Sequence, residues 1–225
     1  MTQVALITGF EAYGVHARNP AGEIAARLNG TEVAGARVVG RTLPVAFASL
    51  ANAIDKVLAE VDPALVISLG LCPGEPVVRL ERVGINLADL DIPDNEGLVQ
   101  VDRPIEGDGA SARFSTLPMR AIHDALLEAG IPARLSNTAG TYLCNMALYR
   151  FLGAIEQRGG SVPCGFVHLP YLPEQVAAAL AESQRSHNVE SYRPTNLASM
   201  DLAAMIEAVR IGLEVSLTTI GPARG

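Results

Sequence analysis

Cys144 is the residue whose position most suggests chemistry. It follows the turn-like AGTY segment and opens the helix-like run CNMALYRFLGAIEQ. At a helix start, a thiol lies beside unpaired backbone N–H groups and the positive end of the helix dipole, which favours the thiolate. The same N–H groups can hold the oxyanion of a tetrahedral intermediate. Many cysteines are instead small buried hydrophobic residues. The sequence position of Cys144 therefore agrees with either a nucleophile or a structural thiol.

His168 ends an apolar run and precedes Pro170. A neutral imidazole at this place can take the proton of a thiol and later protonate a leaving amine. A core histidine with both ring nitrogens hydrogen-bonded is an equal alternative. The other histidines are expected at the surface, and the other cysteines are expected to be structural: His16, His123, His187, Cys72 and Cys164.

A Cys–His pair usually needs a third group that orients the imidazole. The candidates are the acidic residues beyond position 72: Glu75, Glu81, Asp89, Asp91, Asp94 and Glu96. Glu81 lies in a stretch with strand character, although an ion pair with Arg79 or Arg82 would also explain it. The acidic run over residues 89–96 lacks EF-hand spacing, so a solvated loop is favoured over a calcium site. No histidines have the spacing of metal ligands, and we expect no metal.

The segments around these candidates alternate between strand-like and helix-like patterns. Apolar runs predict buried strands over residues 4–10, 64–71, 133–140 and 165–170, with further strand within 77–87. Amphipathic patterns predict helices over residues 19–30, 47–61 and 202–213. The alternation predicts an α/β fold with an open, mostly parallel twisted sheet and helices on both faces. In such sheets the site lies at the carboxyl ends of the strands, and we expect the irregular region 72–117 to fold over it.

Composition narrows the class of protein. Of the 225 residues, 49% are hydrophobic and 18% are charged, which suits a large core and excludes intrinsic disorder. A net charge of −7 and 4% aromatic residues argue against nucleic acid and anionic membranes as partners. The three cysteines form no CxxC pair, and no apolar stretch resembles a signal peptide or a membrane span. We therefore expect one domain over residues 1–225, located in the cytoplasm.

Four segments, taken together, match a known family. They are ITGFEAYG followed by Asn19-Pro20, ERVGINL followed by IPDNEG, AGTYLCN, and FVHLPYLPEQ, in this order between residues 7 and 175. The chain resembles the bacterial pyrrolidone carboxyl peptidases, also called pyroglutamyl peptidase I, which are cytosolic cysteine peptidases. The resemblance implies removal of N-terminal pyroglutamate (5-oxoproline) from peptides, without metal or cofactor. It also implies an open α/β sheet like that of nucleoside phosphorylases, and a homotetramer.

The resemblance assigns roles to individual residues. The family's catalytic triad falls here on Glu81, Cys144 and His168. The family's substrate-binding positions fall on Phe10, Tyr13, Asn19 and Tyr142. Pyroglutamate is a neutral lactam, so an apolar slot with a few fixed hydrogen bonds suits it better than an ion pair does.

Three positions depart from the family pattern. Leu71 stands where members often have Gln, Ala12 where they often have Pro, and Asp91 where they often have Arg. The reversal of charge at Asp91, together with Leu71, leaves an alternative open, a catalytically weak homologue that binds pyroglutamyl or similar small molecules. It is equally compatible with a surface acid that has no effect on catalysis. A phosphorylase-like transferase follows from fold analogy alone, which is a weak argument.

Overall fold

A seven-stranded sheet forms the centre of the protein in the computed structural model, which describes residues 2–14, 16–186 and 197–220. The strands are β1 (Val4–Phe10), β2 (Glu32–Val33), β3 (Ala36–Leu43), β4 (Leu65–Leu71), β5 (Val78–Glu81), β10 (Ala133–Ser136) and β11 (Cys164–Leu169). They lie in the order β10-β5-β11-β4-β1-β3-β2. Two small sheets pair β6 (Val83–Ile85) with β9 (Ala112–Phe114) and β7 (Ala88–Leu90) with β8 (Gln100–Arg103).

Most neighbouring strands of the central sheet run parallel. Strand β1 lies parallel to both β3 and β4, β11 is parallel to β4, and β10 is parallel to β5. The exceptions are β5, which is antiparallel to β11, and the short edge strand β2, which is antiparallel to β3. The predicted mostly parallel α/β sheet is thereby confirmed, with β5 and its parallel neighbour β10 running opposite to β11.

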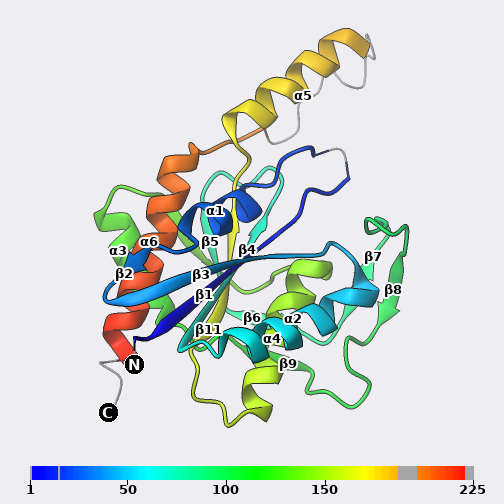
Figure 1. Ribbon diagram of the computed structural model, residues 1–225. Coiled ribbons are helices and arrows are strands. Elements are labelled where there is room, and N and C mark those ends of the chain that lie inside the picture. The colour runs from blue at the N-terminus through cyan, green and yellow to red at the C-terminus, as the bar shows by residue number, and fades with distance from the viewer. Residues whose placement is uncertain (1, 15, 187–196, 221–225) are drawn as a thin grey trace.

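Helices cover both faces of the sheet (Figure 1). One face packs against α1 (Pro20–Leu28), α3 (Met119–Glu128) and α6 (Leu202–Ile220), and the other against α2 (Phe47–Val61) and α4 (Leu143–Gln157). Successive residues of β1 alternate between the two cores: Ala5 and Ile7 join the first, and Leu6 joins the second. This is why the central strands are largely apolar on both faces, with Thr8 and Ser68 buried as a hydrogen-bonded pair. Helix α5 (Pro173–Ser186) projects from the body.

The sequence pattern located the most apolar elements and missed the more polar ones. The strands expected at 4–10, 64–71 and 165–170 and the helices expected at 19–30 and 47–61 are present within two residues at each end. The strand expected at 133–140 ends at Ser136, and the helix expected at 202–213 continues to Ile220. Strand β3 and helices α3 and α5 were not predicted. In β3, the exposed Arg37 and the half-buried Arg41 interrupt the apolar run because this strand lies near the sheet edge.

No helix within the described ranges is long and apolar enough to cross a membrane.

Candidate active site

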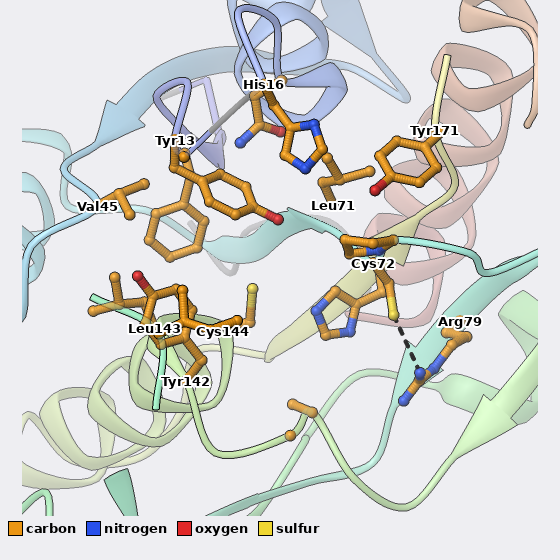
Figure 2. Close-up of a pocket in the computed structure, with 18 of the residues that line it drawn as sticks. Tyr13, His16, Val45, Leu71, Cys72, Arg79, Tyr142, Leu143, Cys144 and Tyr171 are labelled. Atoms are coloured by element: carbon orange, nitrogen blue, oxygen red, sulfur yellow. Dashed lines mark hydrogen bonds between the residues drawn. The ribbon is translucent and has the colours of Figure 1, made fainter. Parts of the chain in front are cut away.

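A cavity of about 670 Å³ lies where the carboxyl ends of β1, β4 and β11 meet the start of α4 (Figure 2). Two of the predicted catalytic residues, Cys144 and His168, line it. All four predicted substrate-binding residues line it as well: Phe10, Tyr13, Asn19 and Tyr142. The third predicted catalytic residue, Glu81, lies behind His168 and is fully buried. The structure thus brings together residues that are up to 158 positions apart, from Phe10 to His168.

Cys144 is the second residue of α4, as the helix-start argument predicted. Its sulfur packs against β4 at Gly70, where an added Cβ would come within 2.8 Å of Sγ. Glycine at this position therefore leaves the room that the thiol occupies. The N-cap residue Tyr142 makes no side-chain capping bond, so the first backbone N–H groups of α4 are left without intrahelical partners next to the sulfur.

The pKa of the Cys144 thiol is raised above its ordinary value. Desolvation by the surrounding protein is the main cause, and the nearby Cys72 and Glu81 raise it further. Arg79 and the Cys144 backbone N–H act in the opposite direction and are outweighed. The helix start alone predicts a stabilised thiolate, and desolvation of this thiol acts in the opposite direction. Burial disfavours the charged form more than the helix terminus favours it.

A raised pKa means that Cys144 is a neutral thiol at neutral pH and deprotonates only when it reacts. The absorbance of the Cys144 thiolate is measured as the difference between the ultraviolet spectra of wild type and Cys144→Ala. This difference should be absent at neutral pH. It should appear only above about pH 8.5, the ordinary pKa of a thiol. Circular dichroism at each pH would verify that both proteins stay folded. An absorbance step near neutral pH would instead demonstrate a preformed thiolate–imidazolium pair.

His168 is held by Glu81. The His168 Nδ1 atom lies 2.8 Å from Glu81 Oε1, and the ring of Phe166 packs edge-on against the imidazole at 4.9 Å between centroids. Strand pairing sets this contact, because Glu81 faces Phe166 and Arg79 faces His168 across the antiparallel β5–β11 pair. With Nδ1 engaged, Nε2 is the ring nitrogen available to the cavity, so Glu81 selects the tautomer and orientation of a general base.

Arg79 is a second partner of Glu81 that the sequence argument treated only as an alternative. Its guanidinium lies 3.0 Å from Glu81 Oε1 and 3.3 Å from Glu75 Oε2, and it donates a 2.8 Å hydrogen bond to Ser136. Glu81 therefore makes both contacts that the sequence left open, with the histidine and with the arginine. Arg79 and Glu81 lie two positions apart in a strand, so their side chains point to the same face of the sheet. This spacing is the sequence feature that indicates their ion pair.

The start of α4 is anchored by Asn145, the residue after the candidate nucleophile. Its buried amide accepts a 2.9 Å hydrogen bond from the backbone N–H of Ile85 and donates 2.9 Å bonds to the carbonyls of Ile85 and Leu87. The AGTYLCN and ERVGINL segments are thereby joined, and the position of Cys144 depends on the segment that follows Glu81. Sequence reasoning assigned no role to Asn145.

The segment IPDNEG forms a wall of the cavity through Ile92 and Pro93. The acidic run was predicted to be solvated, and for Asp94 this is wrong. The Asp94 side chain is buried and accepts a 2.8 Å hydrogen bond from the backbone N–H of Phe47, at the start of α2. Asp94 therefore supplies the capping group that the N-cap residue of α2, Ala46, lacks.

Asp91 is exposed, does not line the cavity, and is not among the groups that shift the pKa of Cys144. Its position agrees with the surface-acid alternative rather than with an effect of its charge on the thiol. The departure at Leu71 does reach the site, because this residue lines the cavity.

The predicted substrate-binding residues differ in how far their polar groups are already hydrogen-bonded within the protein. Phe10 is buried at the end of β1, and Tyr142 donates a 3.1 Å hydrogen bond to the carbonyl of Pro93. Asn19 caps α1, since its Oδ1 accepts from Ala21 N at 3.1 Å, and its Nδ2 donates to the Glu11 carbonyl at 2.9 Å. Most of the hydrogen-bonding capacity of Asn19 is therefore used within the protein.

Tyr13 is the residue of the four whose polar group is most available to a ligand. Its hydroxyl points into the cavity (Figure 2) and has no hydrogen-bond partner among the described residues. Desolvation and the proximity of Cys144 raise the pKa of this phenol, so it is a hydrogen-bond donor at neutral pH.

Two residues outside the predicted set also line the cavity. His16, expected at the surface, is half-buried, and Cys72, expected to be structural, accepts a 3.4 Å hydrogen bond from Arg79; both face the cavity. Neither residue follows a regular sequence pattern, because each lies in a loop after a strand. Cys164 is fully buried, as expected of a structural cysteine, whereas His187 lies outside the described residues.

A thiol, an imidazole and a buried carboxylate at the edge of an α/β sheet define a hydrolase site of the cysteine peptidase class. In the described part of the chain, no three His, Cys, Asp or Glu side chains are grouped as metal ligands would be.

Comparison with known proteins identifies the family. The family model described as pyroglutamyl peptidase matches residues 3–219. The pyrrolidone-carboxylate peptidase of Pyrococcus furiosus is 40% identical over 212 residues, which cover 94% of this chain and 97% of that protein. The one from Yersinia pseudotuberculosis is 40% identical over 95% of this chain and 96% of that protein. The structure of a mutant pyrrolidone carboxyl peptidase from P. furiosus superposes with a TM-score of 0.89 at 37% identity, covering 97% of this chain and 100% of that one. The chain belongs to the pyroglutamyl peptidase family.

Proposed function

We propose that Cys144, His168 and Glu81 are the catalytic triad of this enzyme, a cysteine peptidase that removes N-terminal pyroglutamate from peptides. The activity follows from membership of the family, and the roles of the residues are the proposal. The observation that carries it is the 2.8 Å contact between His168 and the fully buried Glu81, at the cavity that also contains Cys144.

Catalysis begins with transfer of the thiol proton from Cys144 to His168 as the sulfur attacks the pyroglutamyl carbonyl carbon. Glu81 stabilises the imidazolium that forms and keeps its ring oriented. The C–N bond of the tetrahedral intermediate then breaks, and His168 gives the proton to the departing amine. Water, deprotonated by His168, attacks the thioester, releasing pyroglutamate and restoring the thiol. Because the thiol is neutral at rest, proton transfer accompanies attack.

The oxyanion of the intermediate is stabilised by backbone N–H groups in the first turn of α4. Leu143, Cys144 and Asn145 begin this helix, and none of these amides has an intrahelical acceptor. Asn145 holds the turn in place through its bonds to Ile85 and Leu87. Such fixed donors stabilise developing negative charge without having to reorganise.

The lactam ring binds between aromatic and aliphatic side chains. Phe10, Tyr13 and Tyr142 line this part of the cavity, and Phe47 holds the ring of Tyr142 edge-on at 5.4 Å. The free hydroxyl of Tyr13 is the side chain best able to hydrogen-bond a polar atom of the lactam, because Asn19 is largely engaged in capping α1.

The function is tested by comparing a pyroglutamyl arylamide with the corresponding prolyl arylamide. Proline lacks the ring carbonyl, so a buried donor loses its partner, which costs about 1–3 kcal/mol. We expect kcat/KM for the prolyl compound to be lower by up to about 100-fold for each donor lost. Tyr13→Phe should reduce this preference while still cleaving the pyroglutamyl compound. Equal turnover of both arylamides by wild type would contradict the proposed pocket.

The location, the domain organisation and the assembly are further parts of the proposal. Three free cysteines are typical of a reducing compartment and support a cytoplasmic location. The two cores on either face of one sheet support a single domain over residues 1–225. The family resemblance implies a homotetramer, and the projecting helix α5, on which Leu180 is exposed, offers a surface that a partner could cover. Light scattering of the purified protein would give its mass and so test the assembly.

A further inference from the structure

The cavity extends to both sides of the Cys144 sulfur. In Figure 2, the labelled side chains of Val45, Tyr142 and Leu143 lie on one side of Cys144, and those of Cys72 and Tyr171 lie on the other. In the first group, Tyr142 belongs to the part of the cavity to which the lactam ring is assigned, and Val45 and Leu143 lie on the same side of Cys144. The second group has no part in binding the ring or in the triad.

The chemistry of the reaction requires a binding region on that second side. The carbon attacked by Cys144 is bonded to the lactam ring on one side and to the leaving nitrogen on the other. When the ring lies against Tyr142, the residue that follows pyroglutamate must point away from it. Its side chain then reaches Cys72 and Tyr171.

One wall of this second region is aromatic, and Arg79 lies beside Cys72, to which it donates a 3.4 Å hydrogen bond. The rings of Tyr13 and His16 meet edge-on at 5.4 Å, and those of His16 and Tyr171 lie 5.4 Å apart at 57°. The loop that carries His16 is held to Tyr13 by a 3.0 Å backbone hydrogen bond. Burial lowers the pKa of His16, so its ring is neutral at neutral pH and presents an uncharged surface. Rings at this spacing pack favourably against a further aromatic ring.

The same two residues connect the cavity to a second one. His16 and Tyr171 also line a neighbouring cavity of about 670 Å³, whose far wall is α5. Its lining includes Val176 and Ala179 together with Arg18 and Glu174. A peptide chain that passes His16 and Tyr171 therefore has a path along α5, with both apolar and charged side chains beside it.

We propose that His16, Cys72 and Tyr171 form a subsite for the side chain of the residue that follows pyroglutamate, that this subsite prefers an aromatic ring, and that the peptide continues along α5. The inference rests on the proposed function, because it takes the ring to lie on the opposite side of Cys144.

The test compares two substrates that differ only in the second residue, pyroglutamyl-phenylalanine amide and pyroglutamyl-alanine amide. Wild type should cleave the phenylalanine compound with a higher kcat/KM. Tyr171→Ala and His16→Ala should each reduce the ratio of the two kcat/KM values by about tenfold, the effect of losing one favourable ring contact. Tyr171→Phe keeps the ring and should keep the ratio. Phe114→Ala, which removes an exposed ring that lines neither cavity, should leave both rates unchanged.

The possible outcomes separate this inference from the proposed function. A wild-type ratio near one would overturn the subsite, and so would equal losses on both substrates in Tyr171→Ala and His16→Ala. If wild type cleaves neither compound although its fold is intact, the proposed function itself fails. The path along α5 is tested with Val176→Asp. This variant should lower kcat/KM more for a pyroglutamyl tripeptide amide, which has a third residue, than for the dipeptide amide. An equal loss would overturn that part.

Discussion

Replacing Cys144 with serine should lower kcat/KM for a pyroglutamyl arylamide by at least about 10⁴-fold, the usual scale for loss of a triad nucleophile. A hydroxyl is much harder to deprotonate than a thiol, and the desolvated site that raises the pKa of Cys144 penalises an alkoxide even more. Serine is no larger than cysteine, so it fits below Gly70 without displacing β4. Amine release measures the effect, and thermal unfolding verifies the fold.

Cys164→Ala is the matched control, because it removes a fully buried thiol that does not line the cavity. Its activity per folded molecule should stay within a few-fold of wild type, although some stability is lost with the buried sulfur. Mass mapping after a short iodoacetamide pulse should show that labelling of Cys144 parallels the loss of activity. Retained activity in Cys144→Ser would exclude Cys144 as the nucleophile. Loss of activity that parallels the labelling of another cysteine would exclude it as well.

Glu81→Gln should lower kcat by about 10³- to 10⁴-fold with a much smaller change in KM. Glutamine is nearly isosteric and still reaches His168 Nδ1 at the 2.8 Å separation, but its amide no longer stabilises the imidazolium and can hold the wrong tautomer. Removing the charge also leaves Arg79 with one acidic partner fewer. A kcat effect without a comparable KM effect is expected, because the imidazolium forms only during reaction.

Glu75→Gln is the matched control for this variant. Glu75 is also buried and also pairs with Arg79, at 3.3 Å, but it makes no contact with His168. It should lower stability, because it pairs with Arg134 at 2.7 Å as well, while changing kcat by less than about tenfold. If both variants lost kcat equally, the effect would belong to the Arg79 cluster, and Glu81 would not be the residue that orients His168.

The local sequence was enough to determine the central elements and the chemical types at the site. Apolar runs predict β1, β4 and β11 because strands buried on both faces are mostly apolar. The glycine-terminated strand ends and the helix after AGTY placed Cys144 and His168 among the candidates. Matching of four motifs to a family then singled out Glu81, which spacing alone left among six acidic residues.

Only the tertiary structure decided how these groups act, because their interactions are between segments distant in sequence. Glu81 contacts His168 since β5 runs antiparallel to β11, a reversal that no local pattern encodes. The same packing desolvates Cys144 and so reverses the pKa shift expected from a helix start. Asp94 and Asn145 are polar residues in loop-like and helical contexts, yet both are buried and hold other segments in place. Periodicity reports which face of an element is buried, whereas the charges and donors that meet there depend on strand order and register.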